Sequence, residues 1–503
     1  MKIKKIMKKK YSLLLLLFIS ICCKTDKNEI SETIKSDYIE EMTQVNTRFN
    51  KYVNNNYFAL YSLGQYDFTK KIDSLRGTYT TLINQYKGKL DESIIKDDFL
   101  TVNATFYQKI LEYPNQHKKF TGENVLISKK NQETIDNFSK KFNDASLLSN
   151  KNFRKFTKYY ITIESRKKLK SHIYDTLDNQ QLTADWNTIE TLFKNQDVSD
   201  FWKQEYLYDH IDNIGIKNID AFYTNFITTC KKTDYTTKIN EIYNLQKKRR
   251  TSHRIETYKR VNGFELDMHL FLPDPNSFNG NRPTIVQFHG GSWSIGNPDW
   301  FFGTAEEYAK QGWIVAVVEY RIKARQGTYP FEAVKDAKSA IRWLRENAKK
   351  YKIDPNKILA TGNSAGGHLA LATTLTTYWN EKTDNLTISA KPNSLIVNAA
   401  VYDLTDNNTK WIVENLENKE VVKEISPNHL MKKTITKMLL IHGDKDRNCP
   451  YDSATHFYQK MKSLGNNIEL YTIQGGYHRV WYGKHYTEVA KVTREYIQKL
   501  NYN

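Results

Sequence analysis

The stretch KILATGNSAGGHLAL, residues 357–371, decides the fold of the second half of this 503-residue chain. Its first five residues have the apolar character of a buried strand, and its last five read as the start of a helix. Between them, Gly362–Gly366 places Ser364 on a tight strand-to-helix turn, the pattern of a serine nucleophile. The backbone of such a turn is strained and its neighbours must be small, which the glycines and Ala365 satisfy. We therefore expect the Ser364 hydroxyl to stand above the edge of a sheet.

The sequence around this stretch alternates short β-branched runs with amphipathic helices, which is typical of an α/β fold. An Asn262-Gly263 turn predicts an antiparallel hairpin of Ile255–Val261 and Leu266–Leu272. Further strands are expected at Thr284–Phe288, Ile314–Glu319, Lys357–Thr361, Leu395–Val401, Met438–His442 and Ile468–Ile473, with a crossover helix at Ala333–Ala348. Near-continuous apolar strands imply a mostly parallel sheet that helices cover on both faces.

The first half of the chain, from about residue 30 to 245, predicts an all-α domain. Glycine and proline are sparse there, and apolar residues recur at helical spacing, as at Met42, Val45, Phe49 and Val53. No motif in this region indicates a function. Its aromatic residues could line a sugar-binding groove, although helix packing is the simpler interpretation. The charged run Lys247–Arg250 is interpreted as a linker to the α/β domain at 253–500.

A glycine-rich turn, His289–Trp293 (HGGSW), follows the predicted strand Thr284–Phe288. A tetrahedral intermediate of acyl transfer carries its charge on one oxygen, which preset backbone N–H groups can stabilise. Glycines let the backbone approach that oxygen closely. The position of this turn before the nucleophile therefore predicts an oxyanion-binding loop.

A serine nucleophile needs a histidine to remove its proton and a carboxylate to orient that histidine. Downstream of Ser364, the strand at 438–442 runs into a segment that contains Asp444 and Asp446, and both are candidates for the acid. His478 follows the last predicted strand and is the expected base, with His485 as the alternative. The histidines at 289, 368 and 442 are expected to be structural, bonded to the loops in which they lie.

Residues 253–500 resemble the esterase branch of the α/β-hydrolases, near the hormone-sensitive-lipase-like and the feruloyl or acetylxylan esterases. The resemblance is carried by His289–Trp293, Tyr320-Arg321, Gly362–His368, His442-Gly443 with Asp446 and Pro450, and Gly476–His478. It favours Asp446 over Asp444 as the acid. It also implies that the N–H groups of Gly291, Ser292 and Ala365 bind the oxyanion.

This chain departs from the family pattern at three places: Ser292 replaces a third glycine, Asn363 a common Asp, and Cys449 a usual Val. None of these changes removes a catalytic group. The resemblance implies a two-step acyl transfer to Ser364, without a metal or an organic cofactor. Aromatic side chains are expected to line the pocket, namely Trp293, Tyr402, Tyr477 and Trp481. Acylated carbohydrate, as acetyl or feruloyl esters, is the expected substrate.

Two other functions compete with an exported esterase. A peptidase of the prolyl-oligopeptidase type also carries a large N-terminal domain, but that domain is a β-propeller, and aromatic residues usually flank its nucleophile. Here the first half reads as helical, and Asn363 and Ala365 flank Ser364. The second alternative is an inactive hydrolase-fold scaffold with a helical interaction module. The presence of all three triad residues weighs against it.

The N-terminus, residues 1–23, reads as a lipoprotein-type signal peptide. A lysine-rich segment precedes a short apolar run that ends at Cys22-Cys23. Cys23 is the preferred lipidation site over Cys22, while an ordinary secretory signal or an uncleaved anchor stays an alternative. A periplasmic or outer-membrane lipoprotein of a Gram-negative bacterium is therefore expected.

The net charge of +19 raises the question of an acidic partner. The lysines are scattered along helical stretches near acidic residues, which favours a solvated surface over a binding stripe. No nucleic-acid-binding module is found, so the expected partners are an ester substrate and, through the lipid, a membrane. Cys230 and Cys449, the cysteines outside the signal, are expected to be small buried residues and not a disulfide pair.

Overall fold

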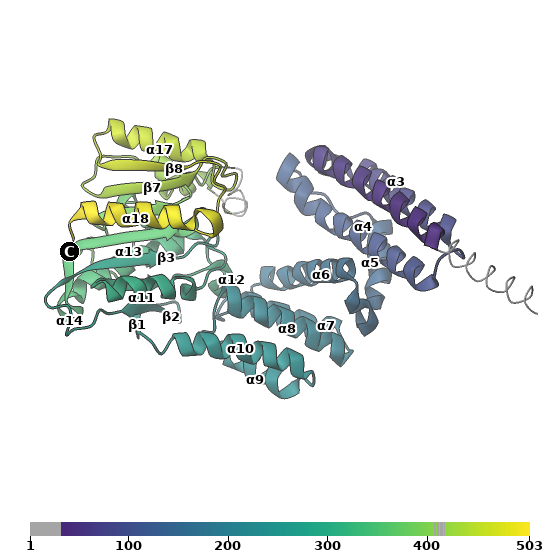
Figure 1. Ribbon diagram of the computed structural model, residues 1–503, viewed down its shortest axis with the longest axis horizontal. Coiled ribbons are helices and arrows are strands. Elements are labelled where there is room, and N and C mark those ends of the chain that lie inside the picture. The colour runs from purple at the N-terminus through teal and green to yellow at the C-terminus, as the bar shows by residue number, and fades with distance from the viewer. Residues whose placement is uncertain (1–31, 407–408, 410–411, 413–415, 417, 503) are drawn as a thin grey trace, which may run out of the picture. The chain divides into compact units, whose positions relative to one another are not determined.

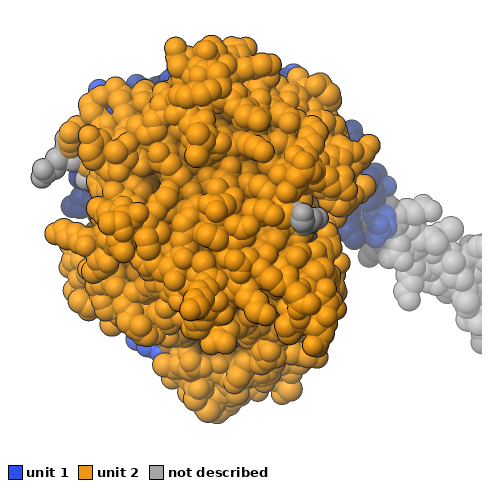
Figure 2. All heavy atoms as spheres, turned by 90° about the vertical axis from the view of Figure 1, so that its left-hand side faces the viewer, with its two compact units in different colours: residues 1–167, 188–199 blue, residues 168–187, 200–503 orange. Residues whose placement is uncertain are grey.

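The computed structural model describes residues 32–502 except 407–408, 410–411, 413–415 and 417. The predicted signal sequence, with Cys23, lies outside the described residues. The chain divides into two compact units, coloured separately in Figure 2. Unit 1 comprises Met1–Lys167 and Thr188–Ser199, and unit 2 comprises Lys168–Asn187 and Asp200–Asn503. Within the described ranges, no helix combines the length and the apolar character needed to cross a bilayer.

Unit 1 is helical, as its sequence predicts. A first helix covers residues 32–55. The following elements are α2 (Tyr57–Ser62), α3 (Gln65–Tyr86), α4 (Glu92–Thr121), α5 (Lys129–Ser139), the 3₁₀ turns η1 (Lys140–Asn143) and η2 (Ala145–Ser149), and most of α6 (Lys151–Lys170). The expected apolar stripe is confirmed, because Val45 and Val53 are buried. Aromatic rings fill the core, with Phe68 stacked on Tyr113 at 3.9 Å between centroids.

The helices nearest the sheet in sequence belong largely to unit 2. They are α7 (Gln180–Leu192) and α8 (Gln196–Asn213), which both span the two units, and α9 (Asp220–Thr229) and α10 (Thr233–Arg249). Leu182, Trp186, Leu207, Phe226 and Ile239 form a shared buried cluster among them. The compact units therefore do not divide where the sequence texture changes, near residues 245–253.

The charged run Lys247–Arg250 is not a linker, which corrects the interpretation from sequence. Lys247, Lys248 and Arg249 form the last turn of α10. Basic side chains are favourable at that end of a helix because the unpaired carbonyl groups give it a partial negative charge. Arg250 follows the helix and pairs with Asp299, at 3.0 Å between its Nη2 and Oδ1. The run ends a helix and contacts the α/β region directly.

Unit 2 contains an eight-stranded sheet with the strand order β1-β2-β4-β3-β5-β6-β7-β8 (Figure 1). The pairs β1–β2 and β2–β4 are antiparallel, and all other neighbours are parallel. The strands are β1 (Arg254–Val261), β2 (Phe264–Phe271), β3 (Arg282–Phe288), β4 (Ile314–Val318), β5 (Ile353–Asn363), β6 (Ser394–Asn398), β7 (Lys437–Gly443) and β8 (Ile468–Ile473). This topology is the α/β-hydrolase fold, as predicted.

The predicted strands are all present, with differences at their ends. β5 begins four residues before the predicted Lys357, and β6 ends at Asn398 and not at Val401. Asn262 and Gly263 both have positive φ, 51° and 81°, which a two-residue hairpin turn between β1 and β2 requires. The crossover helix starts earlier than expected, at Pro330, because proline suits the first helical position.

Helices cover both faces of the sheet. One face packs against α13 (Pro330–Glu346), α15 (Ala365–Leu375) and α17 (Tyr451–Ser463), and the other against α11 (Phe302–Lys310) and α18 (Tyr486–Leu500). The connections contain the short elements η3 (Pro298–Phe301), α12 (Lys323–Gln326), α14 (Ala348–Tyr351), η5 (Lys419–Glu424), η6 (Pro427–His429) and η7 (Gly483–His485). Cover on both faces explains why every residue of β4 and β6 is buried.

Candidate active site

Ser364 stands on the turn between β5 and α15, with φ 53° and ψ −119°. This conformation is strained for a residue with a side chain and persists only where the surroundings enforce it. The surroundings are tight. A Cβ at Gly366 would lie 2.0 Å from the Phe288 carbonyl oxygen, and one at Gly362 would lie 2.4 Å from the carbonyl carbon of Gly366. The glycines of the motif are therefore required by the close approach of β3 and of the turn itself.

The structure brings the three predicted triad residues together from three loops. His478 Nε2 lies 3.0 Å from Ser364 Oγ, and His478 Nδ1 lies 2.8 Å from Asp446 Oδ2. Asp446 follows β7, and His478 follows β8, so all three side chains lie at the carboxyl edge of the parallel strands. Asp444 and His485, the alternatives from sequence, lie elsewhere: the Asp444 N–H donates to Ile473, and His485 pairs with Glu488 at 3.6 Å.

Asp446 is held as an anion. Its Oδ1 accepts from the N–H groups of Asn448, at 2.8 Å, and Cys449, at 3.0 Å. Burial raises the pKa of the Asp446 carboxyl, but hydrogen bonds from His442 and His478 outweigh burial and hold that pKa well below its ordinary value. His442 Nε2 lies 3.3 Å from Asp446 Oδ2. An ionised carboxylate in this place fixes the tautomer of His478 and stabilises its protonated form.

The glycine-rich turn lies directly beside the nucleophile. A Cβ at Gly290 would lie 3.0 Å from the Asn363 carbonyl oxygen and 3.5 Å from Ser364 Cβ. His289 stacks on Tyr320 at 4.2 Å between ring centroids, and the Tyr320 hydroxyl donates to the His289 carbonyl oxygen at 2.7 Å. Burial lowers the pKa of His289 to about 4. A neutral His289 therefore supports this turn without placing a second positive charge beside His478.

The N–H groups predicted to bind the oxyanion belong to Gly291, Ser292 and Ala365. In the described part of the chain, none of these three N–H groups has an acceptor. Gly291 and Ser292 have positive φ, 111° and 54°, which turns successive N–H groups of a loop toward one side. Ala365 begins α15, where the first N–H groups of a helix have no intrahelical partner. The site thus offers free donors next to the Ser364 hydroxyl.

The Tyr320-Arg321 pair fixes the end of β4 beneath this loop. Arg321 binds Asp336 of α13 through Nε and Nη2, at 2.9 and 2.8 Å, and its Nη2 also donates to Glu381 at 3.1 Å. Lys259 adds a third contact to Asp336 at 2.7 Å. All of these groups are largely buried, so the positive and negative charges compensate one another away from water.

The predicted pocket residues lie in different environments. Trp293 is 1% exposed and packs in the core with its ring edge-on to His368, so it is not a pocket wall. Tyr402 is also buried, although it lines a small hollow with Asn448 and Cys449. Tyr477 is 66% exposed beside His478, and Trp481 contacts the His478 ring edge-on at 5.5 Å. Trp293 lies in the hydrophobic core with a positive φ of 54°, and the prediction that it lines the pocket is therefore wrong.

Cys230 and Cys449 are buried and unpaired with one another, as expected. Donor atoms of Asp446, Cys449 and His478 lie within 4.8 Å of one another, a spacing that could hold a metal ion. The Asp446–His478 hydrogen bond explains without a metal ion why two of these residues lie close together. Burial raises the pKa of the Cys449 thiol. His442 was expected to bond its own loop, as its 2.8 Å contact with the Cys449 carbonyl confirms, but its contact with Asp446 could not be foreseen from the sequence.

The sequence of the α/β region is similar to the sequences of known esterases. Residues 268–461 match the model of the BD-FAE family, which confirms the resemblance to esterases of the hormone-sensitive-lipase-like and feruloyl type. Among curated relatives, the chain is 25% identical over 233 residues to a probable isoprenylcysteine alpha-carbonyl methylesterase of Arabidopsis thaliana, covering 42% of this chain and 48% of the relative. It is 29% identical over 211 residues to the esterase LipQ of Mycobacterium tuberculosis, covering 38% and 48%.

Among solved structures, the chain is similar to esterase 2 of Thermogutta terrifontis, with 28% identity and a TM-score of 0.46. The similarity covers 50% of this chain and 96% of that one. The chain spans about half the length of the curated relatives named above, 48% of each.

Proposed function

We propose that residues 254–500 are a serine esterase that cleaves carboxylic esters through an acyl-enzyme intermediate. One observation carries the proposal: a single imidazole bridges Ser364 Oγ, at 3.0 Å, and the ionised Asp446, at 2.8 Å. Free N–H donors stand beside the same hydroxyl. These are the parts that acyl transfer by a serine requires.

The mechanism follows from these contacts. Ser364 attacks the ester carbonyl carbon while His478 Nε2 takes the hydroxyl proton, and Asp446 stabilises the imidazolium through Nδ1. The negative charge of the tetrahedral intermediate lies on the former carbonyl oxygen, where the N–H groups of Gly291, Ser292 and Ala365 can bind it. His478 then protonates the leaving alcohol. A water molecule, deprotonated by His478, releases the acid and restores Ser364.

The names of the relatives support an ester as the substrate. The matched proteins include a methylesterase, esterases and a carboxylesterase. A peptidase of the prolyl-oligopeptidase type is less well supported, because residues 32–253, all of them described, contain no strand from which a β-propeller could be built.

The purified chain provides the test, with a fluorophosphonate probe and two chromogenic substrates. Wild-type protein should bind the probe and release nitrophenol from p-nitrophenyl acetate, and Ser364→Ala should do neither. Release from Gly-Pro p-nitroanilide alone would favour a peptidase. Absence of labelling in folded wild-type protein would favour the inactive scaffold.

For the alcohol side of the substrate, we propose an acylated carbohydrate. Tyr477 and Tyr482, 66% and 67% exposed, flank His478 in the loop after β8. An exposed tyrosine offers an apolar ring face and a hydroxyl, which suit the C–H face and the hydroxyl groups of a sugar. Acetate release from acetylated xylan should exceed butyrate release from tributyrin, and the reverse preference would reject this substrate class.

For localisation, we propose export and lipidation at Cys23, on the lysine-rich and apolar sequence that precedes it. Cells that produce the chain should incorporate radioactive palmitate into it, and Cys23→Ser should abolish the label. Label that persists in Cys23→Ser but is lost in Cys22→Ser would move the site by one residue. Absence of label in the wild type would reject the lipoprotein.

A further inference from the structure

The C-terminus of α8 lies against the loop that carries the oxyanion donors, residues 289–297, named here the oxyanion loop. The last four carbonyl groups of a helix have no intrahelical partner and need donors from elsewhere. In α8 the His210 carbonyl accepts from the N–H groups of Ile214 and Gly215, at 2.8 and 3.1 Å. The other three carbonyl groups accept from the oxyanion loop or from the residues that directly follow it.

Asn297 makes the central contact. Its Nδ2 donates to the Ile211 carbonyl at 3.2 Å, and the Gly296 N–H donates to the Asn213 carbonyl at 2.9 Å. The Trp300 indole N–H donates to the Asp212 carbonyl at 3.3 Å. Asn297 is fully buried, and its Oδ1 accepts from the Asp299 N–H at 3.1 Å. One amide therefore connects α8 with the end of the oxyanion loop.

The second residue after α8, Gly215, is shaped for this contact. Gly215 has a φ of 111°, and a Cβ at its position would lie 3.3 Å from Asn297 Oδ1 and 3.1 Å from Arg250 Nη2. Arg250 in turn binds Asp299, at 3.0 Å. The α8 C-terminus, the end of α10 and the residues after the oxyanion loop thus share one buried polar cluster.

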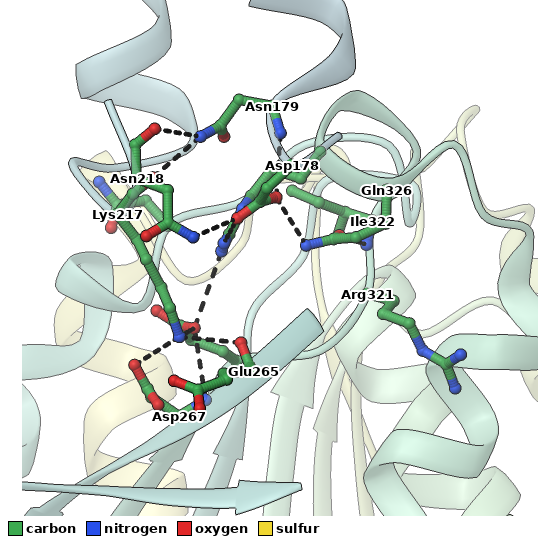
Figure 3. A network of polar contacts seen from close by, with 12 residues as sticks. Asp178, Asn179, Lys217, Asn218, Glu265, Asp267, Arg321, Ile322 and Gln326 are labelled. Atoms are coloured by element: carbon green, nitrogen blue, oxygen red, sulfur yellow. Dashed lines mark hydrogen bonds and ion pairs between the residues drawn. The ribbon is translucent and has the colours of Figure 1, made fainter. Parts of the chain in front are cut away.

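The middle of the oxyanion loop is held by α12. The N–H groups of Lys323 and Ala324 donate to the carbonyl groups of Trp293 and Ser294, both at 2.9 Å. The side chain of Gln326 donates to Asp178 at 3.0 Å, as Figure 3 shows. Arg325 binds the same carboxylate from the same helix. Asp178 precedes α7, so a second part of the helical segment reaches the oxyanion loop through α12.

Gly291 and Ser292 lie in the same loop as these attachments, and all residues involved belong to unit 2. We propose that Asn297 is a positioning residue: through it, α8 sets the place of the oxyanion donors, and the helical residues of unit 2 within 178–187 and 200–250 form a structural part of the esterase site. The inference rests on the proposed function. It assigns a role to a helical segment for which the sequence indicates none.

The physical reason is the accuracy that oxyanion binding demands. The N–H groups stabilise the transition state only when they lie at hydrogen-bond distance from the oxygen as it becomes charged. Loss of one such donor costs about 10²–10³ in kcat in a serine protease. A loop that shifts without losing a donor should lose less, about tenfold. Because the triad lies on other loops, the protonation of His478 should not change.

The experiment compares two variants of the full chain that remove a donor from the same carbonyl group. Asn297→Ala removes one donor to the Ile211 carbonyl, and Gln246→Ala removes the other, a buried contact of 2.6 Å made from α10. Only Asn297 belongs to the oxyanion loop. Both variants should have a lower Tm. Only Asn297→Ala should lose about tenfold in kcat on p-nitrophenyl acetate, with KM within twofold and an unchanged pH profile.

Affinity for a trifluoromethyl ketone, which forms a tetrahedral adduct with the serine, should fall in Asn297→Ala in parallel with kcat/KM. Equal kcat in Asn297→Ala and wild type would overturn the inference, and so would equal losses in both variants. If Asn297→Ala does not fold, Trp300→Phe removes the neighbouring donor at an accessible position and should lower kcat in the same sense. An inactive, unlabelled wild type would instead reject the proposed function itself.

Discussion

The sheet region of unit 2 and the helices of unit 1 differ in how strictly the structure limits the residue type at each position. At Gly366 a single added carbon would lie 2.0 Å from a backbone oxygen. At Gly77, inside α3, an added carbon would meet nothing within 4 Å. The first glycine is required by the turn that presents Ser364, whereas the second is replaceable. Local sequence around the site is therefore specific, and local sequence in unit 1 follows only a pattern of apolar positions.

This difference explains why a function could be proposed from one region and not from the other. A nucleophile turn, an oxyanion loop and a triad each require particular residue types at particular places. A helical core requires only apolar side chains of suitable volume, and many sequences satisfy that condition. Three predictions, ordered by expected effect, test the contrast.

The largest effect is expected from Asp446→Asn. The amide can keep the contacts to the Asn448 and Cys449 N–H groups only by turning its NH₂ toward His478 Nδ1. His478 then takes the tautomer with the proton on Nε2, which cannot accept from Ser364. We expect kcat to fall by about 10⁴, the loss found when a serine protease triad is changed in this way. Steady-state hydrolysis of p-nitrophenyl acetate measures it.

Asp444→Asn is the matched control, since it makes the same chemical change two residues away. Asp444 is two residues from Asp446, but among the described residues it makes no hydrogen bond or ion pair with His478, and kcat should stay within about threefold of wild type. A larger loss in Asp444→Asn than in Asp446→Asn would reverse the assignment of the acid.

Much of the sheet region could be predicted because its signals are local. Alternation of apolar strands and helices predicted an α/β fold, and the motifs that resemble those of esterases implied the α/β-hydrolase type. The strand-end positions of Ser364, Asp446 and His478 anticipated their meeting at one edge. The contacts of Asn297 and Asp178 could not be foreseen. They join segments far apart in sequence, and a buried asparagine has no pattern that separates it from one in a loop. The prediction that Trp293 lines the pocket was wrong for a related reason, because its backbone has a positive φ that the residue type does not predict.

Lowering the pH should have a smaller effect, a loss of folding stability that is confined to unit 2. His368 is fully buried, its Nε2–H donates to the Ile425 carbonyl at 2.7 Å, and burial lowers its pKa to about 4. The unfolded chain, with a histidine pKa of about 6.5, takes the proton first. The contribution of neutral His368 to stability is therefore complete above pH 6.5, shrinks as pH falls and is gone below pH 4, a loss of about 3 kcal/mol.

Urea unfolding of unit 2, followed between pH 7 and pH 4.5, measures this dependence. His368→Gln keeps a donor for the Ile425 carbonyl but cannot be protonated, so its midpoint should depend less on pH than that of wild type. The quantity to compare is the change of the urea midpoint with pH and not the midpoint itself, because the substitution also changes packing. Identical slopes in the two proteins would show that His368 is not among the groups that titrate on unfolding.

The smallest effect is expected from Gly77→Ala, and its sign is opposite. Glycine inside a helix costs roughly 0.5–1 kcal/mol relative to alanine because the unfolded chain loses more freedom there. No atom lies within 4 Å of the added carbon, so no clash offsets the gain. The Tm of unit 1 should rise by about 2 °C in calorimetry, with kcat unchanged. The same substitution at Gly366 should abolish both the fold of the turn and the activity. A lower Tm in Gly77→Ala would mean that α3 is constrained as closely as the nucleophile turn, and the contrast between the two regions would disappear.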